Sequence, residues 1–403
     1  MNQNNFMISI EEAQKLISAQ ARNFGVEEIS IDDALNRILA EDIFADRDYP
    51  PFNRATMDGY AVIAADFNKE KQITLQLIGT LHAGNVSAQI VRTGTCIKIM
   101  TGAPVPQGAD AVVRFEDTAE NNAVVQFTID TVLPKQNIAS QGEDTKASEL
   151  ILEKNIKLEA LSIAVLAVAG KAKIKVHKLP NVVIVSTGNE IVHVSDAIFP
   201  HQIRDSNSYS LKNFLKQYNI SSVKSVLVED DKSTLTSVLS DFLSADILIL
   251  SGGVSKGEAD YVPEVLMSLG VQEIFHRVRI KPGNPLWFGK LPNGGVVFGL
   301  PGNPVSVQVG FKIFIEPFLR KCFNMEIIAP LYFPLFNEKI KKTKFTEYFP
   351  CKISTRNNTT GLVSKRMNTS GDISATLHSD GIAVHPEVTE TIKENTIVEF
   401  YFW

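Results

Sequence analysis

The chain has 403 residues, of which 44% are hydrophobic and 21% are charged, and its formal net charge is -5. A single hydrophobic core stops growing well below this length, so the composition predicts a folded protein of two to four domains without extensive disorder. The negative charge argues against non-specific nucleic-acid binding, which depends on a basic surface.

The cysteine positions and the hydropathy indicate in which cellular compartment the protein is expected. The three cysteines, Cys96, Cys322 and Cys351, are scattered without a Cys-x-x-Cys spacing, so neither a zinc site nor a disulfide framework is expected. The N-terminus lacks the basic and apolar regions of a signal peptide. The longest apolar stretch, 161–170, is shorter than the roughly 20 residues of a membrane helix and predicts a core helix. We therefore expect a cytoplasmic protein without membrane attachment.

The first part of the chain mixes helix and strand signals. Ser9 to Glu12 has the spacing of a capping box, and apolar residues then recur at helical intervals. Residues 30–33 predict a second helix in the same way. From Tyr49 to about Asn137, Val, Ile and Thr alternate with polar residues, which predicts a β-rich module. Helix and strand signals return in 141–176, with an apolar helix at 158–170.

From residue 181 the pattern changes to alternating strands and helices. Strands are expected at 182–186, 223–228 and 246–250, and helices at 210–218 and 235–243. This alternation is typical of a parallel sheet in an α/β domain. Residues 305–323 predict its closing helix. After about Pro330 the pattern is strand-like to Trp403, with turns at 357–358 and 370–371, which indicates a small C-terminal β domain.

The stretch 246–290 contains the largest group of candidate ligand-binding residues. The apolar run 246–250 is typical of a strand buried on both faces, and Ser251, Gly252 and Gly253 end it in a turn whose N–H groups could hold phosphate oxygens. A helix is expected from about Tyr261, with Asp260 as its N-cap and Pro263 in its first turn. The turn thus brings Ser255, Glu258 and Asp260 to the carboxyl end of a sheet strand, where open α/β sheets bind ligands. Taken alone, such a turn is a weak signal.

Further motifs accompany it. They are PPFNRATMDGYAV (50–62), MTGAPVPQGADAVV (100–113), QGEDT (141–145), STGNEI (186–191), IRDSNSYSL (203–211), SGGVSKGEADYV (251–262), KPGNP (281–285) and LPGNPVSV (300–307). In this order they resemble the molybdopterin molybdenumtransferase family, the MoeA and gephyrin E-domain type. The resemblance covers almost the whole chain.

The resemblance implies a fold and an assembly. It implies a multidomain α/β plus β protein with a doubly wound α/β domain of the molybdopterin-binding type. The expected domains are a mixed N-terminal helical domain (1–48 plus 138–178), an inserted β-rich module (49–137), the α/β domain (179–328) and a small, barrel-like C-terminal β domain (329–403). It also implies a homodimer in which one subunit's β module completes the cleft of its partner's α/β domain.

It also implies a reaction: Mg²⁺-dependent insertion of molybdate into adenylylated molybdopterin, with release of AMP. Possible protein partners are the molybdopterin adenylyltransferase and the apoproteins of molybdoenzymes. Two other functions stay open, namely a molybdopterin adenylyltransferase and a non-catalytic molybdopterin-binding scaffold.

The same resemblance assigns site residues. The expected catalytic residues are Asp58, Asp246, Asp260 and Lys281, and the expected Mg²⁺ ligands are Glu190, Asp246 and Asp260. The expected substrate-binding residues are Thr101, Asp144, Ser251, Gly252, Gly253, Ser255, Asn284, Pro301, Gly302, Asn303 and Ser374. On local grounds, Asp58, Thr101, Asp144 and Glu190 stand in Gly-containing turns that are typical of a protein surface.

The chain departs from the family at two places. Residue 284 is Asn where the family usually has a second lysine, and 344–350 contains no arginine where the family often has two. A neutral amide can still donate to an oxyanion, but charge-assisted hydrogen bonds are roughly twice as strong. We therefore expect a weakened oxyanion site, with Lys344 as a possible substitute and Ser370 or Ser374 as the serine contact.

Overall fold

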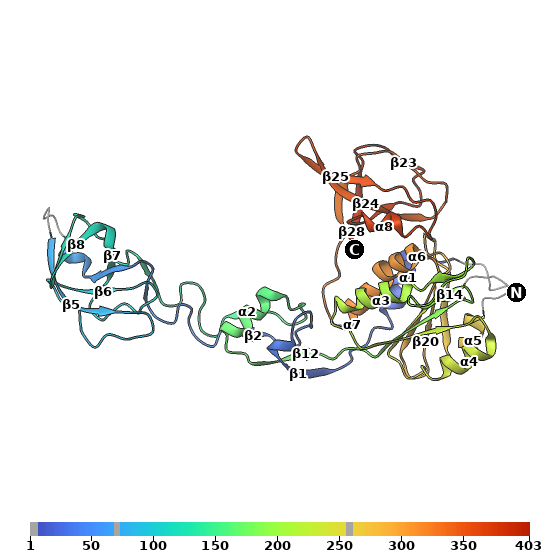
Figure 1. Cartoon of the computed structure of the whole chain (residues 1–403), viewed down its shortest axis with the longest axis horizontal. Helices are drawn as coiled ribbons and strands as arrows, with labels where there is room; N and C mark the ends of the chain where they lie inside the picture. The colour runs from blue at the N-terminus through green and yellow to red at the C-terminus, as the bar shows by residue number, and fades with distance from the viewer. Residues whose placement is uncertain (1–6, 68–72, 255–260) are drawn as a thin grey trace. The chain divides into compact units, whose positions relative to one another are not determined.

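The structure is a computed structural model that describes residues 7–67, 73–254 and 261–403, and the chain divides into two compact units (Figure 1). Unit 1 comprises Met1–Glu41, Asn155–Glu159 and Lys173–Trp403, and unit 2 comprises Asp42–Lys154 and Ala160–Ala172. The chain therefore passes from unit 1 into unit 2 and back twice. This division is coarser than the four predicted domains, whose boundaries stay a prediction.

A six-stranded sheet forms the centre of unit 1. Its order is β16 (Val223–Val228), β13 (Val182–Thr187), β17 (Ile247–Ser251), β21 (Val296–Leu300), β20 (Trp287–Lys290) and β18 (Gln272–His276). The first four strands are parallel, β20 is antiparallel to β21, and β18 is antiparallel to β20. The predicted βαβ pattern is confirmed in this region.

Helices cover both faces of this sheet (Figure 1). Alternate residues of β17 enter different cores: Ile247 and Ile249 pack with α3 (Asn207–Lys216) and α6 (Pro304–Gly310), whereas Leu248 and Leu250 pack with α4 (Lys232–Ser240) and α5 (Val262–Ser268). Every residue of β17 is buried, which explains why the strand shows no alternation in its sequence.

The closing helix and the N-terminal helix pack together. The closing helix consists of α6, a π-helical segment (Phe311–Ile315) and α7 (Glu316–Cys322). The N-terminal helix α1 (Ile10–Ser18) begins as predicted, with Ser9 accepting a hydrogen bond from the Glu12 N–H at 3.1 Å. The predicted second helix is wrong: Ile31–Asp33 form a single 3₁₀ turn. Ser30 still caps this turn, but the following residues provide no helical apolar face to continue it.

Short strands complete unit 1 outside its C-terminal part. They are the antiparallel pair β1 (Val26–Ser30) with β12 (Lys173–His177) and the parallel pair β14 (Ile191–Val192) with β15 (Ile203–Arg204).

The C-terminal part of unit 1 is a second sheet, as predicted. Its order is β19 (Ile280–Lys281), β24 (Thr346–Arg356), β26 (Gly381–His385), β28 (Ile397–Phe402) and β22 (Leu331–Pro334), with β25 (Thr359–Ser364) paired to β24. The predicted turn at Asn357 and Asn358 joins β24 to β25, with φ of 47° and 62°. Further elements are β23 (Lys339–Ile340) with β27 (Thr391–Ile392) and the short helix α8 (Ser374–Leu377).

Unit 2 contains the β-rich module. Its main sheet has the order β7 (Ala111–Arg114), β4 (Gly59–Val62), β6 (Thr95–Ile99), β5 (Ile73–Leu81), β9 (Val124–Phe127) and β8 (Thr118–Asn121). Smaller pairs are β2 (Ile43–Phe44) with β11 (Leu150–Leu152) and β3 (Arg54–Ala55) with β10 (Ile138–Ala139). The β-rich character predicted from the alternation of side chains is confirmed.

The helix α2 (Ala160–Val168) corrects one prediction. Its apolar sequence predicted a core helix, but Leu161 is 82% exposed, Val168 is 62% exposed, and Leu166 is its one buried residue. The helix is apolar on nearly all sides, and its packing within unit 2 covers only one of them. In the described part of the chain, helices long and apolar enough to cross a membrane are absent.

Candidate functional site

The turns that follow β13, β16, β17 and β21 lie along one edge of the unit 1 sheet, because parallel strands end on the same side. The Gly252 N–H donates to the carbonyl of Leu300 at 3.0 Å. The Asn207 amide donates to the Ser251 hydroxyl at 2.8 Å and to the Gly302 carbonyl at 2.6 Å. These bonds join the two predicted loops into one continuous edge.

Gly252 is required by its surroundings. Its φ is +103°, and a Cβ at this position would lie 2.3 Å from the Thr187 carbonyl oxygen. Only glycine fits such a close approach of two backbones. Gly252 is buried, so this close approach fixes the position of the turn at the sheet edge.

Asp230 is a candidate that the sequence reasoning missed. It follows β16 by two residues, and its carboxylate accepts a hydrogen bond from the Thr187 hydroxyl. Its N–H donates to the Asn189 side-chain oxygen at 3.0 Å. A Cβ on Gly253 would lie 3.6 Å from an Asp230 carboxylate oxygen, which places this carboxylate beside the Gly-rich turn. The signal was present in the sequence, because Asp230 follows a strand of the parallel set by two residues.

Asp246 lies at the other end of the sheet, which contradicts its predicted role as a ligand beside that turn. It precedes β17, forms an ion pair with Arg22, and accepts the Asn181 N–H at 2.8 Å. The five residues of β17 separate it from the turn by about 16 Å, at roughly 3.3 Å per residue. The prediction placed Asp246 at the start of the strand, as the structure has it, but a residue at that end does not reach the turn at the other end.

Glu190 lies at the carboxyl edge, after β13. Its carboxylate folds back over Gly188, where an added Cβ would lie 2.8 Å from a Glu190 oxygen. Ser255, Glu258 and Asp260, which the sequence also indicated, lie outside the described residues. The described carboxylates at this edge include Asp230, Glu190 and Asp205, and Asp205 accepts a hydrogen bond from the Ser186 hydroxyl at 3.1 Å.

The predicted oxyanion residues are arranged differently from expectation. The Lys281 side chain is exposed, and it forms no hydrogen bond or ion pair with a described residue. The Asn284 amide donates to the Val278 carbonyl at 2.7 Å and to the Met7 sulfur at 3.4 Å. Both amide hydrogens are thus directed to protein acceptors, so the amide closes the loop and is not available as a donor to an oxyanion. The exposed Lys344, the proposed substitute, also lacks a described partner.

The C-terminal sheet contributes a loop to the start of α6. The Val305 N–H donates to the Ser370 carbonyl at 3.1 Å, and an added Cβ on Gly371 would lie 3.6 Å from the Asn303 side-chain oxygen. The Ser374 hydroxyl donates to Asp372 at 2.5 Å, and this bond is the largest cause that lowers the Asp372 pKa. Ser370 and Gly371 therefore lie next to the loop that contains Pro301, Gly302 and Asn303.

In unit 2, two predicted residues contact each other directly. The Thr101 N–H and hydroxyl both donate to the same Asp58 oxygen, each at 2.7 Å. These bonds, with the N–H first, hold the pKa of Asp58 below its ordinary value. The Asp58 carboxylate is therefore charged at neutral pH and fixed in direction.

The segment 49–55 connects this pair to Asp144. At one end of the segment, the Gly102 N–H donates to the Ala55 carbonyl at 2.8 Å. At the other end, the Asp144 N–H donates to the Tyr49 carbonyl at 3.0 Å. Three motifs that are far apart in the sequence thus meet on one short segment.

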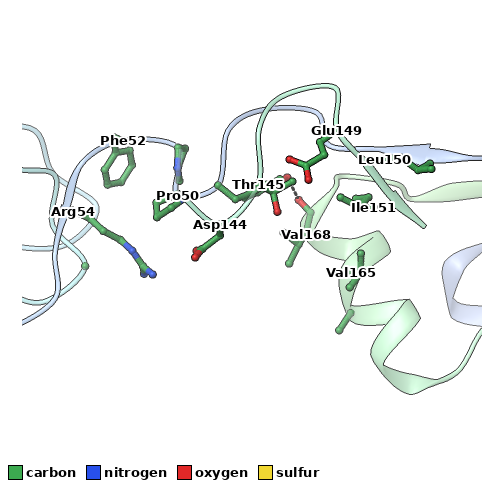
Figure 2. Close-up of a pocket in the computed structure, with 14 residues that line it drawn as sticks. Pro50, Phe52, Arg54, Asp144, Thr145, Glu149, Leu150, Ile151, Val165 and Val168 are labelled. Carbon is green, nitrogen blue, oxygen red and sulfur yellow. Dashed lines mark hydrogen bonds between the residues drawn. The ribbon is translucent and has the colours of Figure 1, made fainter. Parts of the chain in front are cut away.

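A cavity of about 860 Å³ lies beside this segment, entirely within unit 2 (Figure 2). Its lining combines prolyl, aromatic and aliphatic side chains with three charged residues. The lining residues are Tyr49, Pro50, Pro51, Phe52, Arg54, Gly102, Asp144, Thr145, Glu149, Leu150, Ile151, Ala164, Val165 and Val168. The Tyr49 hydroxyl contacts the Val168 carbonyl at 2.7 Å, which holds α2 against the segment 49–55.

Comparisons with known proteins agree with these observations. The MoeA N-terminal region (domain I and II) matches residues 8–170, and a probable molybdopterin binding domain matches residues 183–321. The molybdopterin molybdenumtransferase of Staphylococcus epidermidis is 33% identical over 399 residues, which is 97% of this chain and 94% of the relative. The enzyme of the same name from Synechocystis is 33% identical over 405 residues, covering 98% and 100%.

A solved structure of a relative supports the same family assignment. The molybdopterin biosynthesis MoeA protein from Pyrococcus horikoshii superposes with a TM-score of 0.82 and 28% identity, covering 99% of this chain and 100% of that one. Fold and sequence together define a multidomain protein with a molybdopterin-binding α/β domain, as the sequence predicted. The chain belongs to the molybdopterin molybdenumtransferase (MoeA) family, a family of transferases in molybdenum cofactor biosynthesis.

Proposed function

We propose that this protein inserts molybdate into adenylylated molybdopterin, with Mg²⁺-dependent release of AMP. The observation that supports this most directly is the carboxyl edge of the unit 1 sheet. There the Asp230 carboxylate lies beside the Gly-rich backbone turn, and the Glu190 carboxylate lies beside Gly188, in the turn after β13. Such an edge suits a phosphoanhydride, because N–H groups bind phosphate oxygens and carboxylates bind the accompanying cation.

The residues present fit a Mg²⁺ ion. Groups of three or more potential metal ligands are absent from the described residues, but Mg²⁺ in phosphate sites is commonly held by one or two carboxylates together with substrate phosphates and water. Asp230 and Glu190 would hold it, and Asp260 stays a predicted third ligand. When bound, the ion stabilises negative charge on the phosphate oxygens as the anhydride breaks.

The remaining residues have positioning roles in this proposal. The Gly253 N–H of the turn after β17 holds a phosphate oxygen, since the Gly252 N–H already donates to the Leu300 carbonyl. Lys281, which lacks a protein partner among the described residues, attracts molybdate as a point charge. Asp58 is held as a carboxylate by Thr101 and accepts hydrogen bonds from the substrate.

Assembly and location also belong to the proposal. We propose a homodimer that exchanges substrate and product with a molybdopterin adenylyltransferase and with molybdoenzyme apoproteins. A cytoplasmic location is supported by the three cysteines, which are all buried and unpaired. A monomer by light scattering at micromolar concentration, with full activity, contradicts the dimer.

Asp230→Asn tests the assignment of the sheet edge. The substitution keeps the size of the side chain and removes its charge, so AMP release should fall at least a hundredfold, since it removes a group that binds the cation of the reacting phosphates. Asp241→Asn is the matched control, because Asp241 is exposed at the end of α4 and has no side-chain partner among the described residues. Equal AMP release by Asp230→Asn and the wild type excludes the proposed role of Asp230.

A further inference from the structure

The C-terminal sheet of unit 1 places three ionisable residues in one row across neighbouring strands. Lys281 of β19 is in register with Glu347 of β24, and Glu347 is in register with His385 of β26. Residues that stand directly opposite each other on neighbouring strands point to the same face of the sheet, with their Cβ atoms about 5 Å apart. Lys281 and His385 therefore flank Glu347 on one face of this sheet.

The Glu347 carboxylate is bound by a lysine from a third element. The Lys339 ammonium, in β23, lies 2.9 Å from a Glu347 oxygen and 4.6 Å from the centroid of the Phe349 ring. Phe349 stands two residues after Glu347 on β24, so both contacts lie on the same face of that strand. The side chains of Lys339 and Glu347 are only 19% and 11% exposed. Because such a pair is screened less by water than a surface pair, it holds the carboxylate in place.

The other ionisable groups beside Glu347 do not replace Lys339. The Lys341 ammonium donates its three hydrogens to backbone carbonyls, those of Phe345, Pro386 and Glu387. The His385 ring is fully buried, and burial is the largest cause that lowers its pKa, so the ring carries no charge at neutral pH. Lys281 is therefore the cation that Glu347 would meet if the charge of Lys339 were removed.

We propose that Lys339 is a positioning residue of the oxyanion site: it holds Glu347, which would otherwise pair with Lys281, and so leaves the Lys281 ammonium free for molybdate. This inference rests on the proposed function, which gives Lys281 that role. Lys281 is exposed and forms no hydrogen bond or ion pair with a described residue, although a carboxylate stands opposite it on the neighbouring strand. Opposite charges in this arrangement attract each other, so the ion pair with Lys339 explains why Lys281 stays unpaired.

The rate at which an acetylating reagent labels Lys281 in the full-length protein, measured by mass spectrometry, tests this pairing. Lys339→Met removes the charge but keeps the length of the side chain and its contact with the Phe349 ring. Glu347 should then pair with Lys281 and slow its labelling about threefold or more, because only the uncharged amine reacts and a nearby carboxylate favours the charged form. Lys339→Arg, which keeps the charge, should be labelled like the wild type.

The double variant Lys339→Met with Glu347→Gln separates the effect of charge from that of packing. It removes the carboxylate as well, so Lys281 should again be labelled at the wild-type rate, whereas a packing defect would persist. The matched control is Lys352→Met, because Lys352 is exposed on the same strand, β24, and has no side-chain partner among the described residues. This control should leave the labelling of Lys281 unchanged.

The same variants test the consequence for the oxyanion. In the insertion reaction, Lys339→Met should raise the molybdate concentration for half-maximal rate about fivefold, since Lys281 is then held by Glu347. The maximal rate should stay unchanged, because only molybdate binding is weakened. The double variant should restore the wild-type half-saturation.

The two readouts separate this inference from the proposed function. Slower labelling in Lys339→Met that recovers in the double variant, in a protein that inserts no molybdate, supports the control of Lys281 by Lys339 and contradicts the proposed function. Insertion by the wild type with unchanged labelling in Lys339→Met overturns the inference and leaves the function intact. Slower labelling without a change in half-saturation, or without recovery in the double variant, also overturns it.

Discussion

Asn207 ties two turns of the sheet edge together, and its removal tests how that edge is held. The amide is buried, with 5% of the residue exposed, and donates to Ser251 at 2.8 Å and to Gly302 at 2.6 Å. Each hydrogen bond contributes about 1 kcal/mol net. Gly302 is exposed, so its carbonyl regains a bond to water, whereas Ser251 is fully buried and does not. Asn207→Ala should therefore lower the free energy of unfolding by about 2–3 kcal/mol.

The two tryptophans make the measurement specific. Trp287 and Trp403 both belong to unit 1, and Trp287 is fully buried beside the sheet edge, so their fluorescence during denaturant unfolding reports on unit 1. Ser251→Ala alone should cost about 1 kcal/mol, and the double variant should cost about 1 kcal/mol less than the sum, because both changes remove the same bond. Additive effects, or a loss below about 0.5 kcal/mol for Asn207→Ala, would refute the reasoning.

Two further predictions concern a buried histidine and the missing lysine. His385 is fully buried, and among the described residues neither ring nitrogen has a partner at normal hydrogen-bond geometry. Burial, followed by the charge of Lys341, lowers its pKa. The unfolded state therefore binds the proton more tightly, and stability is lost as the pH falls below the unfolded value of about 6.5. His385→Leu should remove up to about 1.4 kcal/mol per pH unit of this slope, measured by tryptophan fluorescence; an unchanged slope contradicts the role of His385. Asn284→Lys should lower the molybdate concentration for half-maximal insertion several-fold, because it adds a cation, and should lose about 1 kcal/mol of stability with the bond to Val278. Asn284→Ala should show the same stability loss without the gain in affinity, and equal half-saturation in all three proteins argues against a weakened site.

Much of the fold could be predicted because its signals are local. The Ser9 cap, the buried strand predicted at 246–250 and the turn at Asn357 and Asn358 each depend on neighbouring residues. The structure confirms all three, with the strand at 247–251. The helix predicted at residues 30–33 failed for the same local reason. Its cap is real, but a cap begins a helix only when an apolar face follows it.

The helix α2 shows where hydropathy is insufficient. An apolar sequence predicts that a helix is buried, but it does not show how much of the helix surface the neighbouring elements cover. Leu161 and Val168 remain exposed because unit 2 covers only the side that contains Leu166. Burial is a property of the packed unit and is not encoded in the helix alone.

The sequence by itself determined most of the elements, the alternating order of strand and helix, and the residue types that a phosphate and its cation require. Only the tertiary structure decided which of these residues meet. Asp246 and Asp230 are both acidic residues next to strands, but Asp246 precedes β17 and Asp230 follows β16. The parallel strands β16, β13, β17 and β21 all end at one edge of the sheet. Asp230 therefore lies beside the Gly-rich turn, whereas Asp246 lies at the opposite edge. Likewise, Asp58, Thr101 and Asp144 gather around the segment 49–55 through hydrogen bonds between residues that no local pattern relates.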